Sequence, residues 1–314
     1  DWSSDVCSSD LVNPCAEILL SSKSFCNLAE VDLAKYGNNP EELYEALTIL
    51  ARACYRQTLV NLKDGILQES WHLNNEFLRL CGVGLTGIAQ RPELTAYDYK
   101  MMERVTTSAA FSMADELGLQ RPKNITCVKP SGTLSKIMDT TEGVHKPLGK
   151  YIFNNIIFSN HDESLPLLKE ANYHVFPHPF DKTSSIVTFP ICWENINFTK
   201  VESELGTVEV NLESAISQLE RYKLLQLNWT QQNTSVTISY DKEEVPAIIT
   251  WLLDNWENYV GVSFIFRTDP SKSAKELGYA YLPQEVVTKE RYEEYISKLL
   301  PIRSEEHTSE LQSH

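Results

Sequence analysis

The sequence predicts an α/β fold in which helices cover a mostly parallel sheet. Two observations support this expectation. Strand-like and amphipathic runs alternate along the chain, and a short β-branched run at 124–128 leads through a small-residue turn into a helix start. This alternation is typical of either a barrel or a doubly wound sheet. In both folds the loops at the carboxyl ends of the strands hold the active site.

The composition is that of a soluble globular chain with one or two domains. Of 314 residues, 42% are hydrophobic and 23% are charged. The net charge of −15 argues against a broad nucleic-acid or anionic-membrane surface, and no apolar run approaches the ~20 residues of a membrane helix. The cysteines form no paired framework, which is typical of a reducing compartment and predicts a cytoplasmic protein.

Both ends of the chain differ from the rest. Residues 5–11 and 303–314 resemble translations of the two strands of a common sequencing adapter. We therefore expect 1–11 and 303–314 to be artefacts, and 12–302 to be an internal piece of a longer protein.

The first predicted helix begins after Asn39, which can cap it, with Pro40 in the first position. Leucines then recur at helical spacing, and we expect this helix to end near Gly65. A second amphipathic run covers 96–117 and ends at Gly118, as a glycine after the last turn favours.

The remaining elements continue the alternation. Closely spaced glycines in 80–87 indicate a backbone packed against another element. Further strands are expected at 151–159, 185–191, 234–240 and 262–267, and further helices at 212–227 and 242–259.

Two cysteines, Cys15 and Cys26, flank a short apolar stretch, and Glu17 lies two residues beyond the first. Their separation is wrong for most zinc sites and too large for a redox turn with a two-residue spacer. One interpretation is that both are small buried hydrophobes. The other is a hairpin of strands 15–20 and 24–29 that brings the thiols close to disulfide distance.

Glu17 restricts the chemistry open to Cys15. If the segment is extended, the carboxylate points to the same face as the thiol and raises its pKa by like-charge repulsion. This argues against the thiolate nucleophile of a hydrolase. It favours chemistry in which the sulfur reacts as a neutral thiol or radical while the acid moves a different proton.

The turn at 129–135 has two interpretations. Free backbone N–H groups at the start of a helix can hold a phosphate, and Lys129 favours this interpretation. The alternative is a plain capped helix start, since the spacing is not that of a Walker loop. A glycine and three hydroxyl side chains form the turn: Ser131, Gly132, Thr133 and Ser135.

The other cysteines of 12–302 are expected to be packed rather than reactive: Cys54, Cys81, Cys127 and Cys192. His174 and His178 are four residues apart, but the prolines beside them exclude a helix, so we expect no metal site.

The motif Asn13-Pro14-Cys15-Ala16-Glu17-Ile18, with Cys26 eleven residues after Cys15, resembles the radical loop of the adenosylcobalamin-dependent (class II) ribonucleotide reductases. The stretch 128–135 resembles the phosphate-binding turn of the monomeric ribonucleoside-triphosphate reductases in that class. Further agreement lies at 80–87, 142–145 and 235–240. The likeness covers nearly all of 12–302 and corresponds to the carboxyl-terminal half of the catalytic barrel.

This resemblance implies part of a ten-stranded α/β barrel with a central finger loop that carries Cys15. Adenosylcobalamin would initiate the reaction at Cys15, whose thiyl radical removes the ribose 3′ hydrogen. Glu17 would be the general base on the 3′ hydroxyl, and Asn13 would hydrogen-bond the sugar. Cys26 and a partner thiol would deliver two electrons and end as a disulfide.

The resemblance also implies the partners: a nucleotide substrate and thioredoxin or a similar dithiol reductant, with no nucleic acid and no membrane. The substrate phosphates would be held by Pro130, Ser131, Gly132, Thr133, Leu134 and Ser135. Ala16 stands where the family usually has glycine, and Asn154 and Asn155 stand where it often has arginines. Because the partner of Cys26 lies upstream in the family, we expect the chain alone to be inactive.

Two other functions are considered. One is a fragment of a class I ribonucleoside-diphosphate reductase large subunit, against which the cysteine spacing and the Pro-Ser-Gly-Thr turn argue. The other is a nucleotide-binding regulatory protein with a degenerate radical site. Retention of Asn13, Cys15, Glu17 and Cys26 together argues against it.

Overall fold

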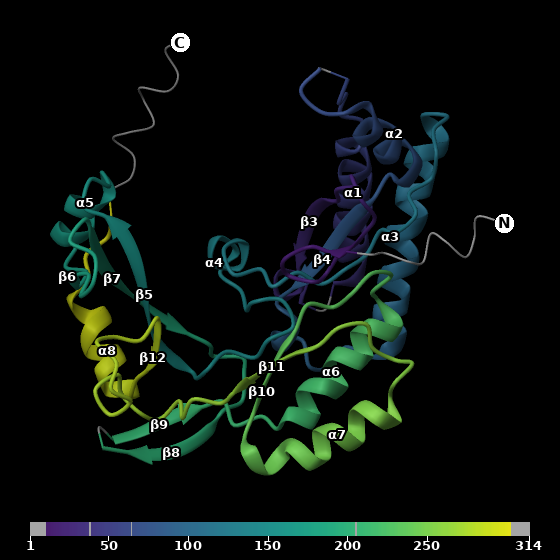
Figure 1. Cartoon of the computed structure of the whole chain (residues 1–314). Coiled ribbons are helices and arrows are strands. Elements are labelled where there is room, and N and C mark those ends of the chain that lie inside the picture. The colour runs from purple at the N-terminus through teal and green to yellow at the C-terminus, as the bar shows by residue number, and fades with distance from the viewer. Residues whose placement is uncertain (1–10, 38, 64, 205, 303–314) are drawn as a thin grey trace. The chain divides into compact units, whose positions relative to one another are not determined.

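The computed structural model describes residues 11–37, 39–63, 65–204 and 206–302. The chain divides into two compact units (Figure 1). The first combines the residues up to Lys146 with Glu213–Arg267, and the second combines Pro147–Leu212 with the residues from Thr268 onward. The suspected adapter segments lie outside the described residues, except for Leu11.

The first unit contains both cysteines of the radical-loop motif and the small-residue turn. Its elements are β1 (Leu11–Val12), β2 (Leu19–Leu20), β3 (Asn27–Asp32), η1 (Leu33–Tyr36), α1 (Pro40–Gln57), α2 (Glu69–Leu78), β4 (Cys81–Thr86), η2 (Ile88–Gln90), α3 (Ala96–Glu116), α4 (Leu134–Met138), α6 (Ala215–Asn228), β10 (Thr237–Tyr240), η3 (Lys242–Glu244), α7 (Val245–Asp254) and β11 (Ser263–Phe266).

Parallel pairings run through the first unit from one extended segment to the next. β3 pairs in parallel with β4 over its whole length, and β10 pairs in parallel with β11. Between these pairs, isolated parallel bridges join Val83 to Thr126 and Val128 to Thr234. The expected parallel arrangement is therefore present here as five segments in series. Among the described residues they do not close into a barrel.

The helices of the first unit bury one large apolar core. α1 and α3 lie side by side, and α6 packs against β10 and α7 (Figure 1). The Asn39 side chain accepts the Glu42 N–H at the start of α1, as expected, but the helix ends at Gln57 rather than near Gly65. The largest fully buried side chains of this core include Tyr55, Leu47, Leu85, Leu219, Tyr222 and Trp229.

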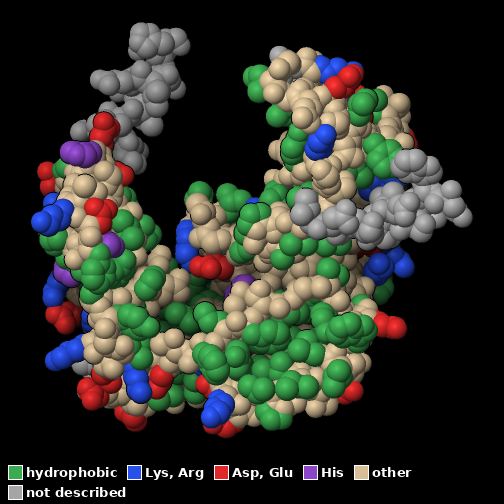
Figure 2. Space-filling model, viewed as in Figure 1, with side chains coloured by type: hydrophobic (Ala, Val, Ile, Leu, Met, Phe, Trp, Pro, Cys, Tyr) green, Lys and Arg blue, Asp and Glu red, His purple; other side chains and the backbone are tan. Residues whose placement is uncertain are grey.

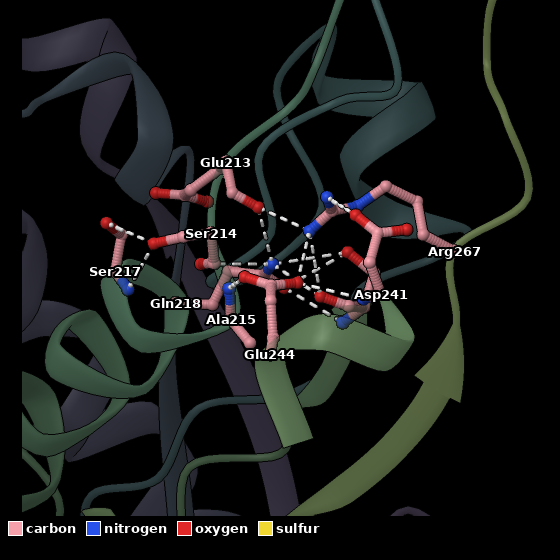
Figure 3. A network of polar contacts seen from close by, with 9 residues as sticks. Glu213, Ser214, Ala215, Ser217, Gln218, Asp241, Glu244 and Arg267 are labelled. Carbon is pink, nitrogen blue, oxygen red and sulfur yellow. Dashed lines mark hydrogen bonds and ion pairs between the residues drawn. The ribbon is translucent and has the colours of Figure 1, made fainter. Parts of the chain in front are cut away.

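Arg267, directly after β11, joins three elements of the first unit (Figure 3). Its Nη2 donates to the carbonyl oxygens of Glu213 at 2.7 Å and Ser239 at 3.2 Å. The guanidinium also pairs with Asp241 and Glu244, while its own side chain is only 11% exposed. This one side chain therefore fixes the chain before α6, the end of β10 and the end of β11.

We expect Arg267→Lys to lower the free energy of unfolding by about 2 kcal/mol, because an ammonium group cannot make the forked set of hydrogen bonds. Chemical denaturation of the two proteins measures the difference. Arg121→Lys is the matched control, since the Arg121–Asp115 pair is half exposed on both sides and should contribute nothing measurable. Equal losses in the two variants would contradict this account of Arg267.

An apolar surface remains open on the first unit. Hydrophobic side chains gather over α6 and α7 on the face shown in Figure 2, and those exposed include Leu227, Ile249 and Leu253. All four residues of β11 are exposed, and among the described strands β11 pairs only with β10. In the part of the chain that the structure describes, its outer edge therefore has no backbone partner.

The second unit differs from the predicted parallel sheet. It contains β5 (Tyr151–Ser159), α5 (Ser164–Glu170), β6 (Val175–Pro177), β7 (Ser184–Cys192), β8 (Thr199–Ser203), β9 (Gly206–Val210), β12 (Gln284–Val286) and α8 (Lys289–Lys298). The four-stranded sheet has the order β12-β5-β7-β6, and every pairing in it is antiparallel. β5 and β7 were predicted correctly as strands, but their direction was wrong. Only the connection from β6 to β7, at 178–183, is short enough to favour antiparallel pairing by itself. The connection from β5 to β7 contains α5 and β6, so its length does not decide the direction of pairing.

Candidate active site

Cys15 lies at the tip of a closed loop. β1 and β2 pair on either side of it, with Val12 opposite Leu19. Asn13 closes the loop in two ways: its Oδ1 accepts the Ile18 N–H at 3.0 Å, and its own N–H donates to the Ile18 carbonyl at 3.2 Å. The Cys15 side chain is a free, exposed thiol. A rigid loop therefore presents an accessible sulfur atom.

Ala16 turns the chain between Cys15 and Glu17. Its φ of 60° lies in the left-handed region, which costs a non-glycine residue roughly 1–2 kcal/mol. The segment is therefore not extended, and the expectation that Cys15 and Glu17 share a face by strand alternation is wrong. Cys15 is exposed, whereas Glu17 is 2% exposed.

The Glu17 side chain is buried, and its hydrogen bonding is incomplete among the described residues. Its Oε2 has no hydrogen-bond partner in the part of the chain that the structure describes. Buried polar atoms almost always have a partner, and a carboxylate oxygen without one costs free energy. This oxygen can therefore accept a hydrogen bond from a donor that is not among the described residues.

Two side chains and one backbone N–H of a distant segment hold the Cys15 loop. We call residues 231–235 the clamp segment. The Ser235 hydroxyl donates to the Cys15 carbonyl at 2.6 Å, and Asn233 Nδ2 donates to the Ala16 carbonyl at 2.7 Å. The Asn233 N–H also donates to the Glu17 carbonyl at 3.1 Å. The backbone from Cys15 to Glu17 is thus fixed from across the unit.

Sequence analysis missed the clamp segment. Two of its polar residues, Gln232 and Asn233, are each 1% exposed. The Tyr222 hydroxyl donates a hydrogen bond to the Asn233 Oδ1 at 3.0 Å. The available signal was a run of four polar residues directly before a predicted strand. Polar residues at the end of a strand are common in loops, so the run alone does not indicate a buried site.

Cys26 is half-buried just before β3, and its thiol is free. Burial, together with Cys54 and Glu17, raises its pKa well above the usual range of a thiol. A Cβ atom at Gly82 would lie 3.1 Å from the Cys26 sulfur and 2.4 Å from Leu28 Cδ2. This close approach is the reason for a glycine at that position and confirms the close packing expected of 80–87.

The hairpin hypothesis for the two thiols is wrong. β2 pairs with β1, and β3 pairs with β4, so the strands that follow Cys15 and Cys26 do not pair with each other. The two thiols belong to different parts of the site.

The remaining cysteines are packed, as expected. Cys54, Cys81 and Cys127 are fully buried, while Cys192 in the second unit is half-buried. The Cys54 thiol donates to the Asn27 carbonyl at 3.0 Å. No group of three potential ligands forms a metal site among the described residues, and no helix of the described ranges is long and apolar enough to cross a membrane.

The small-residue turn differs from a plain capped helix. The Thr133 side chain caps nothing at the start of α4, and within the described part of the chain the N–H groups of Gly132 and Thr133 donate to no protein acceptor. Ser131, with φ of 58°, donates its hydroxyl to Glu30 at 2.6 Å instead of to the open side of the turn. Ser135 is fully buried, and its hydroxyl oxygen has no partner among these residues.

Glu30 anchors the turn to β3. Its carboxylate also lies 3.5 Å from Lys129 Nζ, and burial raises its pKa although Ser131 and Lys129 oppose the shift. The turn follows the segment that bridges to Thr234, and the Ser235 N–H donates to the Val128 carbonyl at 2.9 Å. The turn and the clamp segment are therefore neighbours in the first unit.

No model of a known protein family matches the chain. Curated relatives do match: a probable adenosylcobalamin-dependent ribonucleoside-triphosphate reductase from Dictyostelium discoideum is 30% identical over 92% of this chain and 36% of its own length. An adenosylcobalamin-dependent ribonucleoside-triphosphate reductase from Lactobacillus acidophilus is 27% identical over 90% of this chain and 40% of its own length. The chain thus spans well under half of these relatives.

A solved structure shares the fold. The crystal structure of a B12-dependent (class II) ribonucleotide reductase superposes with a TM-score of 0.76 at 23% identity, over 96% of this chain and 44% of that one. The mixed helix and strand fold expected from the sequence is therefore confirmed at the level of an α/β fold. Sequence and structure agree that this chain is related, over most of its length, to a part of the adenosylcobalamin-dependent ribonucleoside-triphosphate reductases.

Proposed function

We propose that this chain is the part of an adenosylcobalamin-dependent reductase that carries the radical thiol, and that the whole protein converts ribonucleoside triphosphates to 2′-deoxyribonucleoside triphosphates. One observation carries the proposal. An exposed thiol, Cys15, sits at the tip of a fixed loop, two residues along the chain from a buried carboxylate, Glu17, whose Oε2 has no partner among the described residues. The names of the curated relatives support the same reaction.

The loop fits a cofactor that acts on the sulfur from outside. Because Cys15 is exposed, a large group can approach it without any change in the core. Adenosylcobalamin, when bound, supplies the radical that removes the hydrogen atom from this thiol. The hydrogen bonds from Ser235 and Asn233 hold the backbone carbonyls of Cys15 and Ala16, so the sulfur keeps its position when it loses and regains that hydrogen.

Glu17 and Asn13 act on the ribose in this proposal. The unpartnered Glu17 Oε2 accepts the proton of the 3′ hydroxyl while the Cys15 thiyl radical takes the 3′ hydrogen. The Asn13 Oδ1 is occupied by the Ile18 N–H, which leaves the Asn13 Nδ2 to donate to the sugar. Burial of Glu17 keeps water away from the proton that it moves.

The turn before α4 would hold the substrate phosphates. The N–H groups of Gly132 and Thr133, which have no acceptor among the described residues, can donate hydrogen bonds to an anion. Lys129 adds positive charge to the same turn. Pro130, Ser131, Leu134 and Ser135 complete the set expected from the sequence. For Ser131 to bind a phosphate through its side chain, its hydroxyl must first leave Glu30.

Cys26 would be one thiol of the pair that delivers two electrons, with the second thiol supplied by the rest of the protein and thioredoxin or a similar dithiol as final reductant. The five parallel segments of the first unit would form half of a ten-stranded barrel, with the Cys15 loop as its finger. We place the protein in the cytoplasm because its six described cysteines are all free thiols.

The longer protein that contains this chain provides the test. We expect it to reduce ribonucleoside triphosphates only when both adenosylcobalamin and a dithiol reductant are present, and to reduce diphosphates much more slowly. The measurement is the yield of deoxynucleotide with each component omitted in turn. Reduction without adenosylcobalamin, or a preference for diphosphates, would favour a class I-type enzyme. Nucleotide binding with no reduction under any condition would favour the regulatory protein.

A further inference from the structure

Gln232, in the clamp segment, faces the second thiol of the site. Its Nε2 donates to the Cys81 carbonyl at 2.8 Å and to the Cys26 sulfur at 3.9 Å. The carbonyl can only accept a hydrogen bond, so it fixes the orientation of the amide. One N–H bond of the amide is therefore directed at Cys81, and the other at the Cys26 sulfur.

The other polar atom of the Gln232 side chain, its amide oxygen, does not stabilise the fold through a hydrogen bond to any described residue. The side chain is 1% exposed, and its Oε1 has no hydrogen-bond partner among the residues that the structure describes. A buried amide oxygen without a partner costs free energy, and such an exception in a folded protein calls for an explanation. Core packing does not explain why a polar amide is buried at this position. A role as hydrogen-bond donor to the Cys26 sulfur does explain it.

The other groups around Cys26 act against a negative charge on its sulfur. Cys54 from α1, Cys81 from β4, Cys127 and Glu17 all lie close enough to influence it or to be influenced by it. Burial, Cys54 and Glu17 raise the pKa of Cys26, whereas the hydrogen bond from Gln232 lowers it. The Cys26 thiol itself donates to the Asn27 carbonyl at 3.7 Å, which stabilises the protonated form.

We propose that Gln232 is a positioning residue for Cys26: its amide holds the sulfur in place and stabilises it as the proton leaves. This inference rests on the proposed function. There, Cys26 and its partner thiol lose two protons and two electrons and form an S–S bond. The two electrons and two protons replace the 2′ hydroxyl of the ribose by hydrogen and release it as water. A hydrogen-bond donor at the Cys26 sulfur assists the loss of its proton, because this thiol is surrounded by other thiols and a carboxylate.

The reactivity of Cys26 with iodoacetamide, followed by peptide mass spectrometry at several pH values, tests the proposal on this chain itself. Only the thiolate reacts, so the rate reports the thiolate fraction. We expect Gln232→Met to slow alkylation of Cys26 roughly tenfold at a given pH, as loss of a hydrogen bond to a charged group predicts. Gln232→Glu keeps the shape of the side chain but removes the donor, and should slow the reaction further.

The matched control is Gln231→Met. Gln231 is the neighbouring glutamine, and its amide bonds to Glu103, Thr107 and Ile125 but not to Cys26. We expect this variant to leave Cys26 alkylation unchanged. Exposed Cys15 serves as an internal reference, and buried Cys54 and Cys127 report opening of the core.

Two results would overturn the inference. One is a Gln232→Glu protein whose Cys26 reacts as fast as in the unsubstituted chain. The other is a Gln232 variant in which Cys26, Cys54 and Cys127 all react faster together, because that pattern shows only loosened packing. The assay uses no nucleotide and no cobalamin. A negative alkylation result therefore contradicts the role of Gln232 but not the proposed nucleotide reduction. Conversely, absence of reductase activity in the longer protein does not change the alkylation result.

Discussion

Replacing Cys15 by serine in the longer protein is expected to abolish nucleotide reduction, by a factor on the order of 10⁴ or more, while the fold stays intact. The sulfur is exposed, and the loop is held through backbone groups and the Asn13 side chain. A hydroxyl O–H bond is too strong to give up its hydrogen atom in place of the thiol. Single-turnover yield of deoxynucleotide measures the loss, and circular dichroism checks the fold.

Cys192→Ser is the control for this experiment. Cys192 is half-buried in the second unit and lies outside the proposed chemistry, so its replacement should leave the yield unchanged. A Cys15→Ser protein that still reduces nucleotides would show that the radical thiol has been assigned to the wrong residue.

Glu17→Gln is expected to lower the activity of the longer protein and to raise the stability of this chain. Loss of the general base should lower the single-turnover rate by about 10²–10⁴-fold. The same change replaces a buried carboxylate by a neutral amide, which costs less to bury without a partner, and should raise the free energy of unfolding of this chain by about 1 kcal/mol. Rapid-quench kinetics on the longer protein and urea denaturation of this chain measure the two effects.

Glu103→Gln provides the contrast for the stability measurement. The Glu103 Oε1 accepts from Gln231 at 2.7 Å and from Thr107 at 3.1 Å, and its Oε2 lies 3.1 Å from Lys100 Nζ, so neutralisation weakens the two hydrogen bonds and removes the ion pair. We expect it to destabilise the chain. If both glutamine substitutions destabilise it equally, Glu17 already has its partners and is not held ready for a substrate hydroxyl.

Two helices of the first unit, α1 and α3, were predictable because local signals define them, whereas α2 was not expected. Asn39 and Pro40 mark the start of α1, and the run at 96–117 agrees with α3 to within one residue. The end of α1 was missed because no glycine or proline stands there: Gln57 is followed by Thr58, whose hydroxyl donates to the Tyr55 carbonyl.

The site was only partly predictable, because much of it depends on contacts between distant residues. The motif identified Asn13, Cys15 and Glu17, but the bond from Asn233 to Ala16 joins residues 217 positions apart. No local pattern encodes such a bond. The position of Glu17 was misjudged for a related reason: the left-handed conformation of Ala16 breaks the strand alternation, and alanine gives no hint of it.

The free edge of β11 has a consequence for handling the protein. Phe264, Ile265 and Phe266 are 37%, 57% and 64% exposed on a strand that, among the described residues, pairs on one side and not on the other. Uncovered apolar edge strands are sites of aggregation, because their backbone groups pair readily with another chain. Preparations of this chain should therefore be kept dilute, and a charged residue in place of Ile265 is the simplest way to keep them from precipitating.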